Sequence, residues 1–413
     1  MNLSDARLIF SARLIRLFAY GFLSIALFLY LSARTLSDAA IGLLLTLTLL
    51  GDAGISLWLT THADRVGRKR TLILGAVLMT FAGIIFALTD NFFVLAFAAI
   101  IGVISPSGGE IGPFLSIEQA ALSQLLPDSQ RTRIFAWYNL VGSFATAFGA
   151  LCGGALAQLL QNNHFTALDS YRAIVIGYAF FGILLAALFL YLSPAVEVTP
   201  SAPHPLTPSP LHPLSSSRFG LHRSQRVILQ LSALFALDAF AGGFIVSSIL
   251  VYWFNQKFGL DVGALGALLF GANVLAGISA LSAARLAQKF GLVNTMVFTH
   301  LPSNVLLMLI PLMPHVWLAV ALLLIRSSIS QMDVPTRQSY TMAVVAPDER
   351  SAASGVTTIA RSIGGAFAPA LSGTLLAIPA LISAPFFIAG SLKIIYDLAL
   401  FQQFRALKPP EEK

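Results

Sequence analysis

Charged residues and cysteines are both scarce in this 413-residue chain. Asp, Glu, Lys and Arg make up only 10% of the residues, whereas soluble proteins carry about 25%. Hydrophobic residues reach 57%, which argues against a soluble enzyme and predicts a protein that lies mainly in lipid. Cys152 is the single cysteine, so neither a disulfide framework nor a multi-cysteine metal site can form within the chain.

Motifs for cofactor or nucleotide chemistry are also missing. The sequence has neither a glycine–lysine loop of the kind that binds nucleoside triphosphates nor an H-E-x-x-H metal pair. We therefore expect no cofactor, no metal, no enzymatic activity and no ATP-driven pumping. The net charge of +7 does not indicate a nucleic-acid partner, because the basic residues lie between apolar runs rather than in a soluble domain.

Long apolar runs are what the sequence does contain. A membrane-spanning helix needs about 20 mostly apolar residues, and this criterion predicts twelve spans. The first is too long for the core of a signal peptide, and no clear small-residue cleavage site follows it. The predicted spans are 8–31, 40–61, 71–89, 93–125, 134–160, 172–192, 227–253, 262–284, 294–313, 316–346, 352–378 and 382–405. An even number places both termini on one side of the membrane.

The basic residues between the spans indicate which side that is. The side without the termini holds only Arg34, Arg172 and Lys257, while most other Lys and Arg residues outside the spans fall on the side of the termini. Cytoplasmic loops are enriched in positive charge, so both termini are predicted to be cytoplasmic. We expect an integral protein of the plasma (inner) membrane, in contact with the lipid bilayer and monomeric.

A proline-rich segment divides the predicted spans into six and six. It runs over residues 193–226, with a series of prolines between Pro194 and Pro213, and such a composition is typical of a semi-extended linker. We therefore expect an N-terminal bundle over 1–192, a cytoplasmic linker, and a C-terminal bundle over 227–413.

The two halves also resemble each other. A shift of 219 residues lays "EQAALSQLLPDSQR" (118–131) on "RQSYTMAVVAPDER" (337–350). Duplicated halves are typical of secondary transporters, whose substrate site lies near the middle of the membrane between the repeats. The expected fold class is an all-α polytopic membrane protein with two pseudo-symmetric six-helix bundles.

The loop between the second and third predicted spans carries the motif "TTHADRVGRKRTL" (60–72). It resembles the cytoplasmic G-x-x-x-D-R-x-G-R-[RK] signature of the major facilitator superfamily, with Thr60 in place of the first glycine. This resemblance implies two six-helix bundles, a central cavity and alternating access. It also implies that Asp64 meets the start of the eleventh span and steadies the outward-open state, as a carboxylate at a helix N-terminus would.

The same resemblance and the repeat indicate a set of cytoplasmic gate residues. Arg65 and Arg68 could pair with carboxylates or lipid headgroups, or the basic cluster could simply set the topology. Glu118 and Arg337 occupy equivalent repeat positions near the cytoplasmic ends of their spans and are interpreted as gate or scaffold residues. The complete predicted gate set is Asp64, Arg65, Gly67, Arg68, Lys69, Glu118, Arg131, Arg337 and Arg350.

Ten residues in the fourth predicted span, "SPSGGEIGPF" (105–114), combine two prolines, three glycines and Glu110. A loop here would leave the following apolar segment too short to cross the membrane. We therefore expect a broken helix whose free backbone groups line a cavity. Ionisable residues within spans are costly and are functional candidates. Glu110 could carry a coupling proton, or it could be paired permanently with a neighbouring helix.

Other charged residues also lie within the spans. Asp333 and Arg337 are four residues apart and predict a structural pair. Arg326, on the same face, lacks a close acidic partner and could hold an anionic substrate group or balance Glu110. Lys393 and Asp397 are expected to neutralise each other. The predicted cavity set is Asp52, Glu110, Asp238, Arg326, Asp333 and Arg361, in which Asp52, Asp238 and Arg361 could line the cavity or be buried in pairs.

These features together predict a secondary active transporter that moves a small organic solute by alternating access, with protons as the coupling ion. The segment "ATAFGALCGG" (145–154) partly matches an antiporter motif, although its small residues could serve only close helix packing. The prediction therefore favours efflux by antiport over proton-coupled uptake of an anionic or zwitterionic metabolite. A membrane-embedded enzyme or a receptor is a remote alternative.

Overall fold

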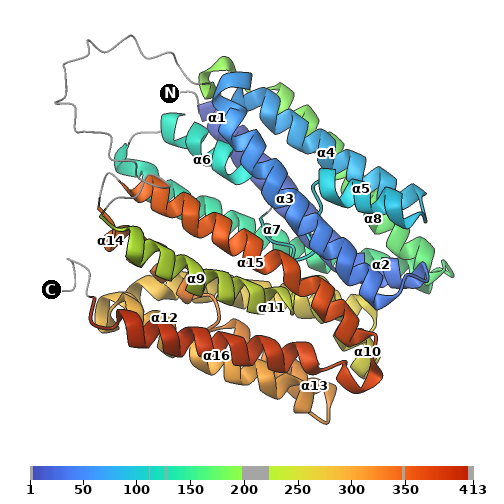
Figure 1. The fold of residues 1–413 in the computed structure, drawn as a ribbon. Helices are drawn as coiled ribbons and strands as arrows, with labels where there is room; N and C mark the ends of the chain where they lie inside the picture. Colours follow the sequence, from blue (N-terminus) through green and yellow to red (C-terminus); the bar gives the residue numbers. More distant parts are fainter. Residues whose placement is uncertain (1–2, 111, 126–127, 198–222, 347–348, 408–413) are drawn as a thin grey trace.

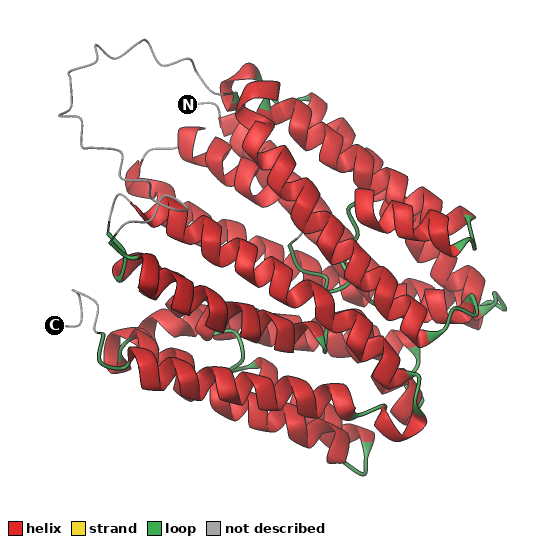
Figure 2. Cartoon of the chain, in the orientation of Figure 1, coloured by secondary structure: helices red, strands yellow, loops and turns green. Residues whose placement is uncertain are grey.

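The structure is a computed structural model that describes residues 3–110, 112–125, 128–197, 223–346 and 349–407. Within these ranges every regular element is a helix (Figure 2). The α-helices of the first half are α1 (Leu3–Ser24), α2 (Leu27–Ala33), α3 (Asp38–Val66), α4 (Arg68–Leu88), α5 (Phe92–Ile101), α6 (Phe114–Leu125), α7 (Asp128–Asn162) and α8 (Ala167–Leu190). Those of the second half are α9 (Gln225–Gly243), α10 (Ser247–Phe258), α11 (Val262–Phe290), α12 (Leu292–Leu309), α13 (Val316–Ser327), α14 (Asp333–Ala343), α15 (Arg350–Leu376) and α16 (Ala384–Phe404). Short 3₁₀ turns lie at Pro194–Val196, Ile310–Leu312 and Pro379–Leu381.

Among the described residues, eight helical segments are long and apolar enough to cross a membrane, and α1 with α2, bent by 40°, make a ninth. The other three predicted spans correspond to α5 with α6, α13 with α14, and α15. These three carry more polar residues or are interrupted, which is why they fall short of a simple length and hydropathy criterion. The prediction of an all-α polytopic membrane protein is confirmed, and the count of twelve spans stays a prediction.

The fourth predicted span is broken where the prolines and glycines predicted a break. Helix α5 ends at Ile101 and α6 begins at Phe114. The backbone groups freed by the break find partners on neighbouring helices. The Tyr178 hydroxyl donates to the Val103 carbonyl at 2.6 Å, and the Gly112 N–H donates to Asp52 at 2.5 Å. Satisfied backbone groups make non-helical chain tolerable at membrane depth. The second half repeats the design, with a break between α13 and α14.

The helices form two groups that lie side by side, α1–α8 and α9–α16 (Figure 1). Helix α1 begins and α16 ends at the same end of the molecule, which we call the terminal end; the opposite end, near α2 and α10, is the distal end. The two groups meet mainly where α3 packs on α15 and α7 packs on α11. The domain limits at residues 192 and 227 stay a prediction, and most of the proline-rich linker lies outside the described residues.

Close backbone approaches join the two groups near the distal end. A Cβ on Gly373 of α15 would lie 2.8 Å from the Cα atom of Gly42 on α3, so only glycine fits at this crossing. The Tyr252 hydroxyl also contacts Asp38 at 3.1 Å. Nearer the terminal end, a Cβ on Gly54 of α3 or Gly355 of α15 would meet no described atom within 4 Å. The two groups are therefore packed at the distal end and separate toward the terminal end.

Candidate transport cavity

Two adjoining pockets lie at the helix breaks among the described residues. One, of about 300 Å³, is lined on the first half by Arg13, Glu110 and the glycines of the α5–α6 break. The other, of about 270 Å³, lies against the second half and is lined by Arg326 and Lys393. The pockets share Asn273, Ala276 and Gln331, so they adjoin each other at the level of both helix breaks and are together called the cavity.

An ion cluster of the first half lies directly behind this cavity, and we call it the first cluster. It consists of Arg13 and Arg16 on α1, Glu110 in the break, and Glu118 on α6. Glu110 pairs with Arg13, and its Oε1 atom also lies 3.2 Å from Arg16 Nη2. Arg16 binds Glu118 with both terminal nitrogens, at 2.8 and 3.0 Å. Such bidentate, charge-assisted bonds are among the strongest that side chains form.

Burial distinguishes the members of the first cluster. Arg16 and Glu118 are fully buried, and the Tyr138 hydroxyl also donates to Glu118. The Glu110 side chain, in contrast, is 20% exposed toward the cavity. Its Oε2 atom is buried and has no hydrogen-bond partner among the described residues. Glu118 is therefore enclosed within the cluster, while the Glu110 side chain is partly exposed to the cavity.

The two arginines of this cluster were not predicted to be site residues. Arg13 and Arg16 lie three residues apart, which places them on the same face of α1. The available signal was this spacing inside an apolar run, together with two acids at positions 110 and 118. The sequence interpretation that Arg326 balances Glu110 is wrong, because Arg13 and Arg16 already hold that carboxylate.

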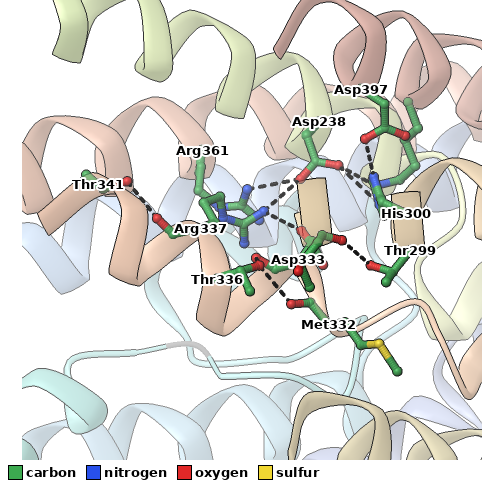
Figure 3. Close-up of polar contacts among 12 residues, drawn as sticks. Asp238, Thr299, His300, Met332, Asp333, Thr336, Arg337, Thr341, Arg361 and Asp397 are labelled. Atoms are coloured by element: carbon green, nitrogen blue, oxygen red, sulfur yellow. Dashed lines mark hydrogen bonds and ion pairs between the residues drawn. The ribbon is translucent and has the colours of Figure 1, made fainter. Parts of the chain in front are cut away.

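A second ion cluster lies in the other half, centred on Asp238 of α9 (Figure 3). Its carboxylate contacts Lys393 at 2.5 Å, Arg361 at 3.1 Å and Arg337 at 3.3 Å. Arg337 also contacts Asp333 at 2.9 Å, so the predicted i,i+4 pair is present. Asp238 and Asp333 are each buried, and Asp238 is thus paired rather than a free part of the cavity wall.

The predicted pair of Lys393 and Asp397 is wrong. Lys393 contacts Asp238, while Asp397 accepts a hydrogen bond from the Asn304 amide at 2.9 Å. Asp397 also contacts His300 Nδ1 at 2.8 Å (Figure 3). Both residues lie on α16, and each finds a partner on a different neighbouring helix. His300, whose Nε2 is 4.0 Å from Asp238, was not predicted either. This second cluster comprises Asp238, His300, Asn304, Asp333, Arg337, Arg361, Lys393 and Asp397.

Arg326 and Asp52 are the two predicted cavity residues that lie outside both clusters. Arg326 lies in the last turn of α13 and lines the pocket of the second half. Its Nε atom is buried and has no hydrogen-bond partner among the described residues. Asp52 instead holds the α5–α6 break, because it accepts hydrogen bonds from the Gly112 N–H at 2.5 Å and the Ser56 hydroxyl at 2.9 Å.

The predicted gate motif is found at the terminal end, where it packs within its own half. Arg68 Nη1 donates to Gln124 at 2.9 Å, and Lys69 Nζ donates to the last carbonyls of α8, at 2.7 Å for Leu190. Gly67 has a φ of +108°, a value that favours glycine, and Glu197 accepts the Arg68 N–H at 2.6 Å. The motif thereby fixes the start of α4 against the end of α8.

The remaining predicted gate residues contribute less to this structure. Arg65 is exposed, and Arg350 Nε donates to the Met342 carbonyl at 3.1 Å within the second half. The side chains of Asp64 and Arg131 lie outside the described part of the structure, so their predicted contacts are not seen. The gating role of the whole set stays a prediction.

Comparison with known proteins identifies the fold. A family model described as Major Facilitator Superfamily matches residues 9–369. The chain belongs to the Major Facilitator Superfamily. Together with the apolar helices, this membership makes the protein an integral membrane transporter for a small molecule rather than an enzyme, as the sequence predicted.

Relatives of the chain include a yeast and a bacterial protein. The chain is 31% identical to "Uncharacterized membrane protein YJR124C" of Saccharomyces cerevisiae, over 97% of this chain and 94% of that protein. It is 25% identical to "Multidrug efflux protein YfmO" of Bacillus subtilis, over 82% and 78% of the two chains. A crystal structure of a D-xylose–proton symporter shares the fold, with a TM-score of 0.72, 16% identity and coverage of 99% and 98%.

Proposed function

We propose that this transporter exports a small organic solute in exchange for protons. The observation that carries the proposal is Glu110, a carboxylate at a helix break that is exposed to the cavity on one side and bound by Arg13 and Arg16 on the other. Ionisable residues at such positions mark ion and substrate pathways. Relatedness to a multidrug efflux protein supports export.

The geometry around Glu110 allows proton binding and solute binding to compete. When Glu110 is ionised, it neutralises Arg13 in the cavity wall. When it is protonated, this ion pair is lost, and the charge that the cavity presents to a solute becomes more positive. A cationic solute would then be released as the proton binds, which is the order that antiport requires. The same cavity would have to face each side of the membrane in turn.

A second candidate function is proton-coupled uptake of an anionic or zwitterionic metabolite. It is favoured by Arg326, which lines the cavity and has no acidic partner among the described residues. In that mode, protonation of Glu110 and binding of an anion would reinforce each other, and proton and solute would move in the same direction.

The terminal end is proposed to face the cytoplasm, with the protein a monomer in the plasma membrane. The structure would then be closed toward the outside and open toward the inside. The gate set around Asp64 is proposed to join the two halves when the terminal end closes. Packing of Arg68 and Lys69 within the first half supports this role, because it fixes the start of α4 directly after the end of α3, which carries Asp64.

Glu110→Gln tests proton coupling in proteoliposomes. The variant should still exchange labelled solute across the membrane, because movement of the halves needs no charge change, but it should lose accumulation driven by an imposed pH gradient. Asp169→Asn is the control, since it neutralises an exposed carboxylate on α8 that lies outside the cavity and both ion clusters. Undiminished gradient-driven accumulation by Glu110→Gln would contradict the proposal, and the sign of the gradient that drives accumulation separates antiport from symport.

A further inference from the structure

The geometry points to Arg326 as the anchor for an organic anion, so that the substrate carries a carboxylate, sulfonate or phosphate group. This inference rests on the proposed function, because it takes the cavity to be the transport path. It favours the anionic solute of the second candidate function over the cationic solute of the exchange scheme.

The first step is the charge balance of the first cluster. Arg13 and Arg16 supply two positive charges, and Glu110 and Glu118 supply two negative ones, all joined by ion pairs. This cluster therefore has no spare carboxylate for a cation on the other side of the cavity.

The second cluster is balanced in the same way. Its three acids are Asp238, Asp333 and Asp397, and its three cationic side chains are Arg337, Arg361 and Lys393. Asp238, the central acid, already contacts all three cations, and Asp397 is occupied by His300 and Asn304. The acids of this cluster are thus equal in number to its arginine and lysine side chains.

Arg326 also lies in the cavity wall, but it belongs to neither cluster, so its charge is not balanced by theirs. Asp333 is the acid nearest to it along the chain, seven residues on, but that carboxylate is bound to Arg337 at 2.9 Å. The Nε atom of Arg326 is buried without a hydrogen-bond partner among the described residues. A buried hydrogen-bond donor that has no acceptor is costly, and an anionic ligand would supply both the missing acceptor atoms and the opposite charge.

The surroundings of Arg326 suit an organic anion rather than a simple inorganic ion. Ser327, Ser330 and Gln331 lie beside it in the pocket and can bind polar groups. Leu269 and Leu323 add apolar surface. Arginine presents a planar fork that fits carboxylate and phosphate oxygens in pairs. With pockets of about 270 and 300 Å³ that share Asn273 and Gln331, the cavity fits a ligand of metabolite size.

Equilibrium binding tests this assignment without any transport assay. The full chain, purified in detergent, is heated with benzoate, benzenesulfonate, benzamide or benzylamine at constant ionic strength, and the midpoint of unfolding is recorded over a concentration series. These probes share one ring and differ in charge. Benzoate or benzenesulfonate should raise the midpoint, whereas benzamide and benzylamine should raise it much less. Anion binding should weaken roughly 10- to 100-fold in Arg326→Gln.

Matched variants keep the experiment decisive. Arg326→Gln should fold, because it removes an unpaired charge, and its midpoint without ligand should equal or exceed that of the parent. Arg326→Lys should keep part of the anion response. Arg172→Gln, which changes an arginine paired with Asp169 on an exposed part of α8, should leave the response unchanged.

The results separate this inference from the proposed function. Equal responses to all four probes, a preference for benzylamine, or an anion response that survives in Arg326→Gln would each overturn the anchor. Flux driven by a pH gradient could still be present in those cases, and the transport proposal would stand. Selective, Arg326-dependent anion binding without any gradient-driven flux would instead support the anchor and contradict proton coupling.

Discussion

Glu118 on α6 and Arg337 on α14 hold opposite charges at equivalent positions of the two halves, and each ties the second part of a broken span to the first helix of its half. Glu118 binds Arg16 of α1 at 2.8 Å, and Arg337 binds Asp238 of α9 at 3.3 Å. Both halves therefore have an ion pair at this place, but the acid and the base are exchanged: the second part of the broken span carries the acid in the first half and the base in the second half. In both halves the pair fixes the helix that follows the break, which leaves the break itself to line the cavity.

Removing one partner of the Arg16–Glu118 pair should destabilise the protein more than removing both. Arg16→Met leaves Glu118 fully buried without its cation, and loss of one partner of a buried pair costs about 3–5 kcal/mol. Arg16→Met combined with Glu118→Met should recover a large part of that loss. Thermal unfolding of the three purified variants measures the effect, and a double variant that is no more stable than the single one would contradict it.

Asp238→Asn and Asp397→Asn should differ in their effect although the substitution is the same. Asp238 faces Lys393, Arg337 and Arg361, so its neutralisation leaves two buried cations and the partly exposed Arg361 with weaker partners. We expect a loss of about 3–5 kcal/mol in stability. Asp397 contacts an imidazole and an amide, and its substitution should cost only about 1–2 kcal/mol. Equal shifts in the unfolding midpoint of the two variants would contradict the larger contribution of Asp238 to stability.

Gly373→Leu should prevent the distal end from closing. The added side chain would meet the backbone of α3, where even a Cβ would lie 2.8 Å from Gly42 Cα. Distances between spin labels at the distal ends of α3 and α15 should therefore become longer and broader. Thr374→Leu is the control, because Thr374 is the next residue along and is exposed. Unchanged distances in Gly373→Leu would show that this crossing does not control closure.

The proposed topology can be tested with one engineered cysteine. Cys152 is the only native cysteine, so Cys152→Ala gives a background without thiols. Ser209→Cys in this background should react with a membrane-impermeant maleimide only after the cells are opened, because the linker is expected in the cytoplasm. Labelling of intact cells would reverse the orientation assigned to the terminal end.

Much of the fold follows from patterns that are local in sequence. Apolar runs of about 20 residues predicted the helices, and the prolines and glycines around Glu110 predicted the break. The partners of Glu110 could not be found in this way, because Arg13 and Arg16 are 97 and 94 residues away along the chain. An ion pair between helices depends on how each helix is rotated and packed, and neither is encoded in one local window.

The i,i+4 rule shows where local reasoning fails. It predicted the Asp333–Arg337 pair correctly and the Lys393–Asp397 pair incorrectly. The spacing brings two side chains to the same helix face with a gain of only about 0.2–0.5 kcal/mol. A buried partner on another helix easily outweighs that gain. Lys393 pairs with Asp238, and Asp397 contacts His300. These partners lie on other helices, so only the three-dimensional packing identifies them.

The neutrality of the two ion clusters has a consequence for the response to membrane voltage. Moving one elementary charge through the full potential changes the free energy by about 2.3 kcal/mol per 100 mV. A cluster that is neutral as a unit contributes almost none of this energy when its half reorients. The voltage dependence of reorientation would then come from Arg326 and Asp52, which lie outside the clusters, and from the bound proton and solute. When an anion is bound to Arg326, the two charges cancel. The reorientation of the loaded protein would then depend less on membrane voltage than the reorientation of the empty protein.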